Sequence, residues 1–245
     1  MPEAVESVVR AMQARLDDLT PEQESLREFL GTYQRTTLAV GKAVDGGAFE
    51  DPTWVEAWDV AFAELYLTAL DAHLAGGTPS RPWRLAFEAP ADLPALRQVL
   101  LGINAHVNYD LPQALLAVIS DDDFADSGLM DRRRRDHEQI DGVLSSRVAA
   151  EDAELSAKGR TLLDRALQPL NRLSSKRFLR EARQKVWHNT VELQTARLAG
   201  PAAYDVRLGE LEVLSAAKIA DLLAPGQVLL RLAVAGFGVV LPPEG

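Results

Sequence analysis

The chain contains no cysteine, and this absence excludes several kinds of chemistry. Disulfide bonds, thiolate zinc sites, iron–sulfur clusters and cysteine nucleophiles all require a residue that the sequence lacks. Any metal ion must therefore be held by histidine, aspartate, glutamate or backbone oxygen atoms. Histidine is itself scarce, with 4 residues in 245. A cluster of several zinc ions would have too few imidazole ligands.

Basic residues and long apolar runs are also in short supply. Lys and Arg number 26 against 36 Asp and Glu, a net charge of −10, which argues against a nucleic-acid backbone as the main partner. The longest apolar run, residues 228–241, is too short to span a bilayer and contains Arg231. The acidic, amphipathic N-terminus lacks the apolar core of a signal peptide. We therefore expect a cytoplasmic protein with no membrane span and no nucleic-acid partner.

Apolar residues recur at helical spacing through most of the chain, and no segment shows clear strand alternation. This pattern predicts one all-α domain over residues 1–245, an irregular bundle of roughly eight helices. Connections are expected at 77–92, at 120–128 and from Gly200 to the next helix. The tail after Pro225 fits either a buried helix or an extended end. The expected helices cover residues 5–16, 20–46, 52–76, 93–110, 112–119, 130–157, 159–167, 169–198 and 210–223.

Residues 100–116, LLGINAHVNYDLPQALL, set four polar side chains in an otherwise apolar helix. His106 and Asp110 are four residues apart and share a face. Asn104 and Asn108, also four apart, project roughly from the opposite side. Because an unsatisfied buried polar group costs roughly 1–3 kcal/mol, such a helix rarely carries four of them without a reason. These four residues are therefore the candidate catalytic or binding residues.

A His-x3-Asp pair on a helix is also a compact bidentate unit for one divalent metal such as Zn, Fe or Mg. His188, beside a tryptophan, and Glu64, an acid in an apolar stretch, are candidates to complete the ligand shell around His106 and Asp110. The metal would polarise a substrate oxygen or activate water. Further candidates for the same shell are Asp136, His137 and Asp141.

Several other charged residues have simpler interpretations. His73, just before Gly-Gly, is expected to act as a cation at a helix C-terminus. His137 lies among Arg and Asp residues and is expected to be solvated rather than a ligand. The basic run 132–135 is bracketed by aspartates, so we expect it to face water. The aromatic row from Trp54 to Tyr66 is expected to be core, with the wall of an apolar pocket as the alternative.

Residues 122–126 read DDFAD, which fits the DDxxD motif with which class I terpene synthases hold magnesium and diphosphate. Their second motif begins at Asn171 and Ser175, but Leu179 stands where a glutamate is required. The alternative is an acidic loop that caps the following helix.

The segment from Gly102 to Pro112, GINAHVNYDLP, resembles a family of uncharacterised bacterial helical proteins that carry a domain of unknown function. The resemblance includes the Trp-rich helix with Glu64 and the later helix at 136–144. It implies an all-α fold and a site near 104–110, and it implies no activity. The same His-x3-Asp followed by Pro112 is more weakly similar to the zinc-dependent phospholipase C and P1-nuclease class. The chain lacks the N-terminal Trp ligand and the later histidine of that class.

Besides a class I terpene-synthase-like enzyme that uses DDFAD, three functions are open. The first is a metal-assisted hydrolase, or related Lewis-acid enzyme, acting on a partly apolar small molecule. The second is a metal-free cyclase, isomerase or binder of a small apolar ligand that uses Asn104, His106 and Asp110. The third is a non-catalytic helical interaction protein whose polar cluster only holds helices together. This last function predicts a closed, dry environment around His106.

Overall fold

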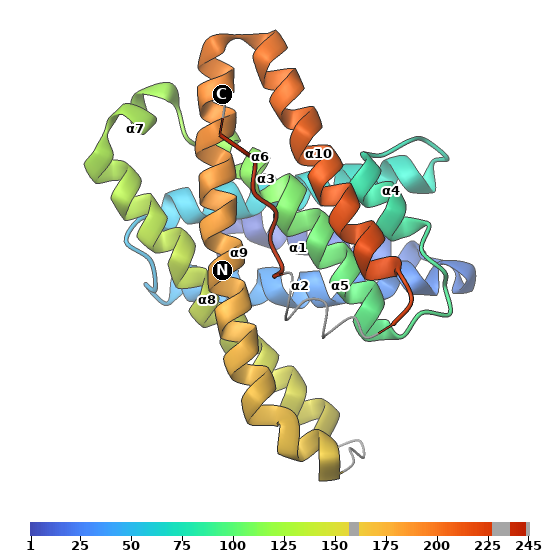
Figure 1. Ribbon diagram of the computed structural model, residues 1–245. Helices are drawn as coiled ribbons and strands as arrows, with labels where there is room; N and C mark the ends of the chain where they lie inside the picture. The colour runs from blue at the N-terminus through green and yellow to red at the C-terminus, as the bar shows by residue number, and fades with distance from the viewer. Residues whose placement is uncertain (157–161, 227–235, 244–245) are drawn as a thin grey trace.

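The computed structural model describes residues 1–156, 162–226 and 236–243, with side chains except at Leu96, 144–156 and 162–179. Its regular structure is helical throughout this part of the chain, so the predicted all-α fold is confirmed (Figure 1). Two short non-α segments accompany the α-helices, a 3-10 helix at Pro21–Gln23 and a π-helix at His106–Asp110. The α-helices are α1 (Glu3–Asp18), α2 (Glu24–Asp45), α3 (Pro52–Leu74), α4 (Arg81–Phe87), α5 (Ala95–Ala105), α6 (Leu111–Val118), α7 (Asp121–Ala125), α8 (Ser127–Ser156), α9 (Leu162–Ala199) and α10 (Pro201–Leu223).

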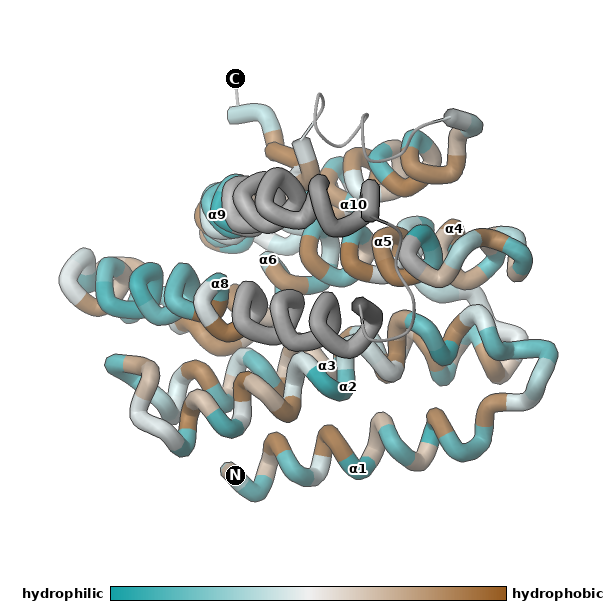
Figure 2. Tube along the Cα trace, turned by 90° about the horizontal axis from the view of Figure 1, so that it is seen from below, coloured by the Kyte–Doolittle hydropathy of each residue, from teal (hydrophilic) through white to brown (hydrophobic). Residues whose placement is uncertain are grey.

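The helices are stacked in layers, and the candidate site lies in the middle of the stack. Figure 2 shows α1 at one edge, then α2 and α3, then α5 and α6, with α9 and α10 at the opposite edge. The π-helix joins α5 to α6 within the inner layer, where it contacts α3 on one side and α9 and α10 on the other. A segment covered on both sides must be apolar or must pair its polar groups.

The sequence pattern explains why α3 begins and lies where it does. Asp51 caps the helix, because its carboxylate accepts the backbone N–H of Trp54 at 3.1 Å, and Pro52 occupies the first turn. The row predicted to be core, which runs on through Trp58 and Phe62 to Tyr66, is buried, so that prediction is confirmed. This row supplies the α3 side of the site.

A single glycine sets how closely α5 approaches α2. A Cβ atom added at Gly102 would lie 2.4 Å from the ring of Phe29. The two helices can pack at this distance only because position 102 has no side chain. The close contact brings the Phe29 ring near His106, which is four residues further along the chain.

Several predicted boundaries were wrong, and the prolines explain most of them. The expected connection at 77–92 contains α4, whose first turn carries Pro82, and α10 starts at Pro201 rather than at 210. Proline suits the first turn of a helix, where its missing N–H would have no partner. In α9 the helix continues through Pro169, since an interior proline removes one hydrogen bond without forcing an end. The predicted break near Gly159 lies outside the described residues.

A second, smaller hydrophobic cluster closes the α9–α10 side of the molecule. Its members are Leu116, Leu193, Leu211 and Leu241, from α6, α9, α10 and the C-terminal segment. The described end of the chain, residues 236–243, is extended rather than helical. In the described part of the chain, no helix is both long enough and apolar enough to cross a membrane.

Candidate functional site

The polar residues of the candidate site lie on a π-helix, which the sequence pattern did not predict. The backbone N–H of Leu111 donates to the carbonyl of His106, five residues earlier, in place of the usual four. Single-turn π segments are rare in proteins as a whole, and those that do occur often lie at functional sites. The wider turn connects α5 and α6 without a break, although Pro112 follows directly.

Within this turn, His106 and Asp110 form a buried pair. Nδ1 of His106 lies 2.9 Å from Oδ2 of Asp110, and the indole Nε1–H of Trp83 donates to the same oxygen at 2.8 Å. The two residues are 2% and 3% exposed. Trp83 comes from α4, a helix that was not predicted from the sequence. The Pro-Trp pair at the start of that helix was the available signal.

Aromatic rings surround the imidazole on several sides. Phe62 stacks on it, with centroids 3.5 Å apart and planes at 4°, and Tyr33 meets it edge-on at 4.4 Å. The full set of rings around the imidazole comes from α2, α3 and α4, so three separate helices build one cage around His106. From the sequence, Phe62 and Tyr66 were expected in the core row, with the wall of an apolar pocket as the alternative. The remaining rings within about 6 Å are Phe29, Tyr66 and Trp83.

Burial determines the protonation state of the pair. It raises the pKa of Asp110 well above its usual value, partly offset by the Trp83 hydrogen bond, and lowers the pKa of His106. Both shifts favour the uncharged form of each group. The carboxyl of Asp110 therefore keeps its proton and donates it to Nδ1, which leaves the hydrogen of the neutral imidazole on Nε2.

Three polar atoms at this cage have no hydrogen-bond partner among the described residues. They are Nε2 of His106 and the hydroxyls of Tyr33 and Tyr66. Burial raises the pKa of both tyrosines, so their hydroxyls stay protonated. Buried polar atoms are paired in the great majority of cases, and exceptions are frequent where a protein has a functional role to fill. Of these three atoms, Nε2 of His106 is the donor that the aromatic rings enclose.

The two asparagines lie on the other side of the turn, as their spacing predicts. Nδ2 of Asn104 donates to the carbonyl of Leu100, and Oδ1 of Asn104 accepts from Nδ2 of Asn108 at 3.1 Å. Asn108 also bonds the backbone of Phe237 and Val239. Asn108 therefore binds the C-terminal segment of the chain, Asn104 holds the side chain of Asn108, and neither contributes to the His106 cage.

The structure does not bring the predicted metal ligands together. Glu64 is exposed on α3, and Nε2 of His188 is bonded to the carbonyl of Leu241 at 3.0 Å. Nδ1 of His106 and one oxygen of Asp110 are engaged with each other. In the described residues, no three His, Asp or Glu side chains gather as a metal site.

His137 is buried, and the prediction that it is solvated was wrong. It is 0% exposed and lies between the rings of Trp58 and Trp187. Asp59, which sequence reasoning missed, is also buried, and burial raises its pKa to about 7. Arg183 is close enough to lower that pKa in part. The signal for Asp59 was an acid inside the apolar tryptophan row of α3.

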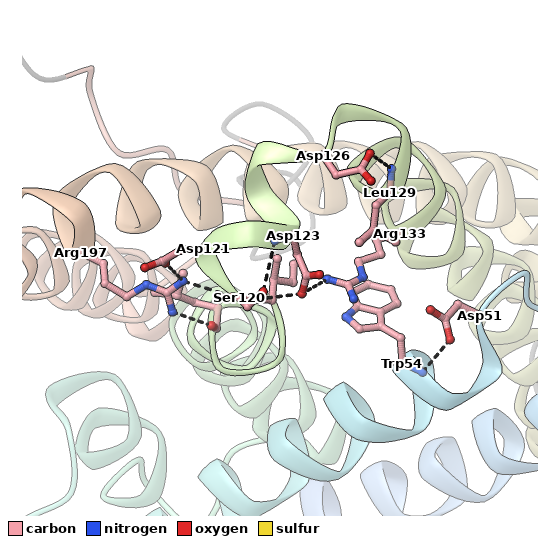
Figure 3. A network of polar contacts seen from close by, with 11 residues as sticks. Asp51, Trp54, Ser120, Asp121, Asp123, Asp126, Leu129, Arg133 and Arg197 are labelled. Atoms are coloured by element: carbon pink, nitrogen blue, oxygen red, sulfur yellow. Dashed lines mark hydrogen bonds and ion pairs between the residues drawn. The ribbon is translucent and has the colours of Figure 1, made fainter.

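The DDFAD segment makes structural contacts (Figure 3). Ser120 caps α7, since its hydroxyl accepts the N–H of Asp123 at 3.1 Å and the Asp123 carboxylate accepts the Ser120 N–H. Asp123 also pairs with Arg133 at 2.8 Å, and Asp126 accepts the N–H of Leu129 at the start of α8. These carboxylates cap helices, as in the alternative interpretation of the segment.

The basic run 132–135 does not lie wholly in water. Arg133 is buried, with its guanidinium 5.5 Å from the ring centroid of Trp54, so the prediction was wrong at this position (Figure 3). Arg134 and Arg135 are exposed, and each pairs with a glutamate. Because successive side chains point in different directions around a helix, one of the four consecutive arginines faces the core. His73 lies in the last turn of α3, as predicted.

Comparison with known proteins identifies a family and no activity. No curated protein and no solved structure matches the chain. A family described as "Family of unknown function (DUF5995)" matches residues 5–225, which include every residue of the His106 cage. The chain therefore belongs to the DUF5995 family.

Proposed function

We propose that the protein binds a small, largely apolar molecule at the His106–Asp110 pair and acts on it without a metal. The observation that supports this proposal is the buried Nε2 of His106, which has no partner in the described residues and lies inside an aromatic cage. The pair would serve as a hydrogen-bond and proton donor. The small-molecule partner and the cytoplasmic location expected from the sequence remain parts of this proposal.

The chemistry of the pair favours acid catalysis. In its uncharged form the pair presents Nε2–H, and the proton shared between Asp110 and Nδ1 can replace a proton that Nε2 gives away. A ligand oxygen would accept from Nε2–H while the rings of Phe62 and Tyr33 bury its apolar part. Isomerisation or cyclisation of a carbonyl-containing substrate fits this arrangement. Metal-assisted hydrolysis has less support, because the two further ligands predicted for it lie elsewhere.

A ligand can reach Nε2 only if a wall of the cage moves. His106 is 2% exposed, and the Phe62 ring lies flat against the imidazole. Rotation of that ring would free one face of His106 without breaking the bond to Asp110. Aromatic side chains in a well-packed core have few alternative rotamers. Ligand entry is therefore expected to be slow relative to diffusion.

The second candidate is the non-catalytic helical protein, and the closed cage favours it. Tyr33 meets the imidazole edge to face at 76°, a geometry in which Nε2–H can point at the ring face. In that case the pair would only tie the π-helix to α2, α3 and α4. The two candidates differ in one property, whether the cage admits a ligand.

A ligand screen with matched variants separates them. Small ketones with apolar bodies, such as acetophenone, are added to wild type, to His106→Phe and to the control His73→Gln, and melting temperature is followed. We expect a rise for wild type and His73→Gln and none for His106→Phe, which keeps an aromatic ring but loses the donor. Shifts at Nε2 of His106 in ¹⁵N NMR would confirm direct contact. If no ketone changes either signal, the structural role is correct.

A further inference from the structure

The described C-terminal segment lies in a groove as a bound peptide would. After a turn at Gly236, where φ is 71°, the segment runs in an extended form to residue 243 alongside α9, on the face that α10 also borders (dark red in Figure 1). Leu241 is 0% exposed and packs in the cluster with Leu116, Leu193 and Leu211. This stretch is held by neighbouring side chains and not by a helix or sheet of its own.

Two asparagine side chains pair with its backbone in the manner of a neighbouring strand. Asn108 donates from Nδ2 to the carbonyl of Phe237 and accepts the N–H of Val239, both at 3.3 Å. Asn189 repeats the pattern two residues on, donating to the carbonyl of Val239 at 3.0 Å and accepting the N–H of Leu241 at 2.9 Å. The spacing of two residues matches the period of an extended chain.

Three cationic or imidazole side chains bind three further carbonyls of the segment. Lys185 donates to Gly238 at 3.2 Å, and Nε2 of His188 contacts the carbonyl of Leu241 at 3.0 Å. Arg207 donates to the carbonyl of Pro242. All of these contacts address main-chain atoms. They can therefore be made by any extended peptide that fits the groove.

Side-chain selectivity comes from three positions of the segment, one of which is Gly236, where φ is 71° and an added Cβ would lie 2.6 Å from Oε1 of Glu181. Leu241 fills the leucine cluster, and Gly238 passes so close to α9 that an added Cβ would lie 2.7 Å from Cδ of Lys185 and 3.3 Å from Cα of Ala182. The first contact is with a flexible side chain and the second with backbone. A β-branched residue at position 238 therefore has little room, and the preferred pattern is glycine followed three residues later by leucine.

We propose that this groove is a binding site for extended peptides, occupied here by the chain's own residues 236–243. The partner is a peptide segment of another protein that carries glycine and, three residues on, leucine, and that displaces the segment. Beside Pro242 the surface has a shallow, open depression of about 460 Å³. It is lined on α10 by Val206, Gly209, Glu210, Val213 and Leu214.

The division between site and occupant coincides with the extent of the family. Asn108, Lys185, Asn189 and Arg207 all lie within residues 5–225, the range that the family matches, and the occupant lies outside that range. The groove is thus part of the family's helical body. The proposal does not depend on the activity of the His106 cage, because the asparagines face away from it.

The test uses the full chain, folded before it is cut. A protease site is inserted after Gly226, the purified protein is cleaved, and a fluorescent peptide with the sequence of residues 236–245 is added. We expect native mass spectrometry to show the cut segment still bound, and anisotropy to show its exchange for the labelled peptide. Peptides carrying Gly238→Val or Leu241→Ala should bind at least tenfold more weakly.

Two variants of the protein itself, both on α9, add a matched comparison. Asn189→Ala should weaken peptide binding about tenfold, as expected for two lost hydrogen bonds, while Val191→Ala, at an exposed position of the same helix, should leave it unchanged. If Asn189→Ala does not fold, the peptide variants still test the proposal. A cut segment that never exchanges, or equal binding of all three peptides, would overturn it.

Discussion

Asp110 holds the imidazole of His106 at Nδ1, across 2.9 Å, and leaves Nε2 as the nitrogen that faces the aromatic cage. Trp83 bonds the same carboxyl oxygen, so the pair is also held from a second helix, α4. This arrangement determines which nitrogen of His106 can meet a ligand, and it links the first and last residues of the π-helix. Both the proposed chemistry and the first prediction below depend on this bond.

Replacing Asp110 with asparagine should destabilise the fold and change the tautomer of His106. The amide oxygen can accept from Trp83 and from His106 together only if the imidazole hydrogen moves to Nδ1, and an amide N–H in that place leaves the Trp83 N–H without a partner. We expect a loss of about 1–3 kcal/mol in the free energy of unfolding, measured by urea denaturation. The exposed acid Asp122 is the control, and Asp122→Asn should change stability by less than about 0.5 kcal/mol. Equal effects of the two changes would contradict a special role for the pair.

The buried carboxyl of Asp59 should make stability fall as pH rises. Its pKa is raised by burial to about 7 in the folded protein and is about 3.9 in an unfolded chain. The folded state therefore binds the proton more tightly than the unfolded chain does. The contribution of this group to stability is fully present below about pH 4. That advantage is lost as pH rises to 7, by at most about 4 kcal/mol. Urea denaturation of wild type and Asp59→Asn at pH 5, 6 and 7 measures it, and the variant should show a shallower pH dependence.

A methyl group at position 102 should disturb the contact between α5 and α2. Gly102→Ala places a Cβ within 2.4 Å of the Phe29 ring, and overpacking of this kind costs about 1–3 kcal/mol. Gly209→Ala on α10 is the control, because no atom lies within 4 Å of its added Cβ. This second change should stabilise the helix by about 0.5–1 kcal/mol. Thermal unfolding of the two variants should therefore shift in opposite directions.

Arg133 should matter to stability more than its neighbour Arg132. Arg133 pairs with Asp123 and stacks over Trp54, whereas Arg132 is exposed. We expect Arg133→Gln to cost about 1–2 kcal/mol and Arg132→Gln to stay within about 0.5 kcal/mol. Chemical denaturation of both variants is the measurement. Indistinguishable midpoints would show that the buried contact contributes nothing.

Local rules predicted those features that depend on residues close together in the chain. The cap at Asp51, the core row of α3 and the opposite placement of Asn104 and His106 follow from spacing along a helix. The predictions for α4 and α10 were wrong because proline can either interrupt a helix or begin one. The π-helix could not be predicted, since the apolar pattern of residues 100–116 is compatible with an ordinary α-helix.

Which residues meet across the layers was decided by tertiary structure. The scarcity of histidine and the absence of cysteine limited the possible chemistry, and the periodicity of the apolar residues determined an all-α fold. Packing then decided that His106 faces Phe62 and Tyr33, that Glu64 faces solvent, and that His188 binds the C-terminal segment. Local sequence sets the direction of a side chain on its own helix. The partners that it meets depend on how distant helices share one core, and no short-range pattern encodes that arrangement.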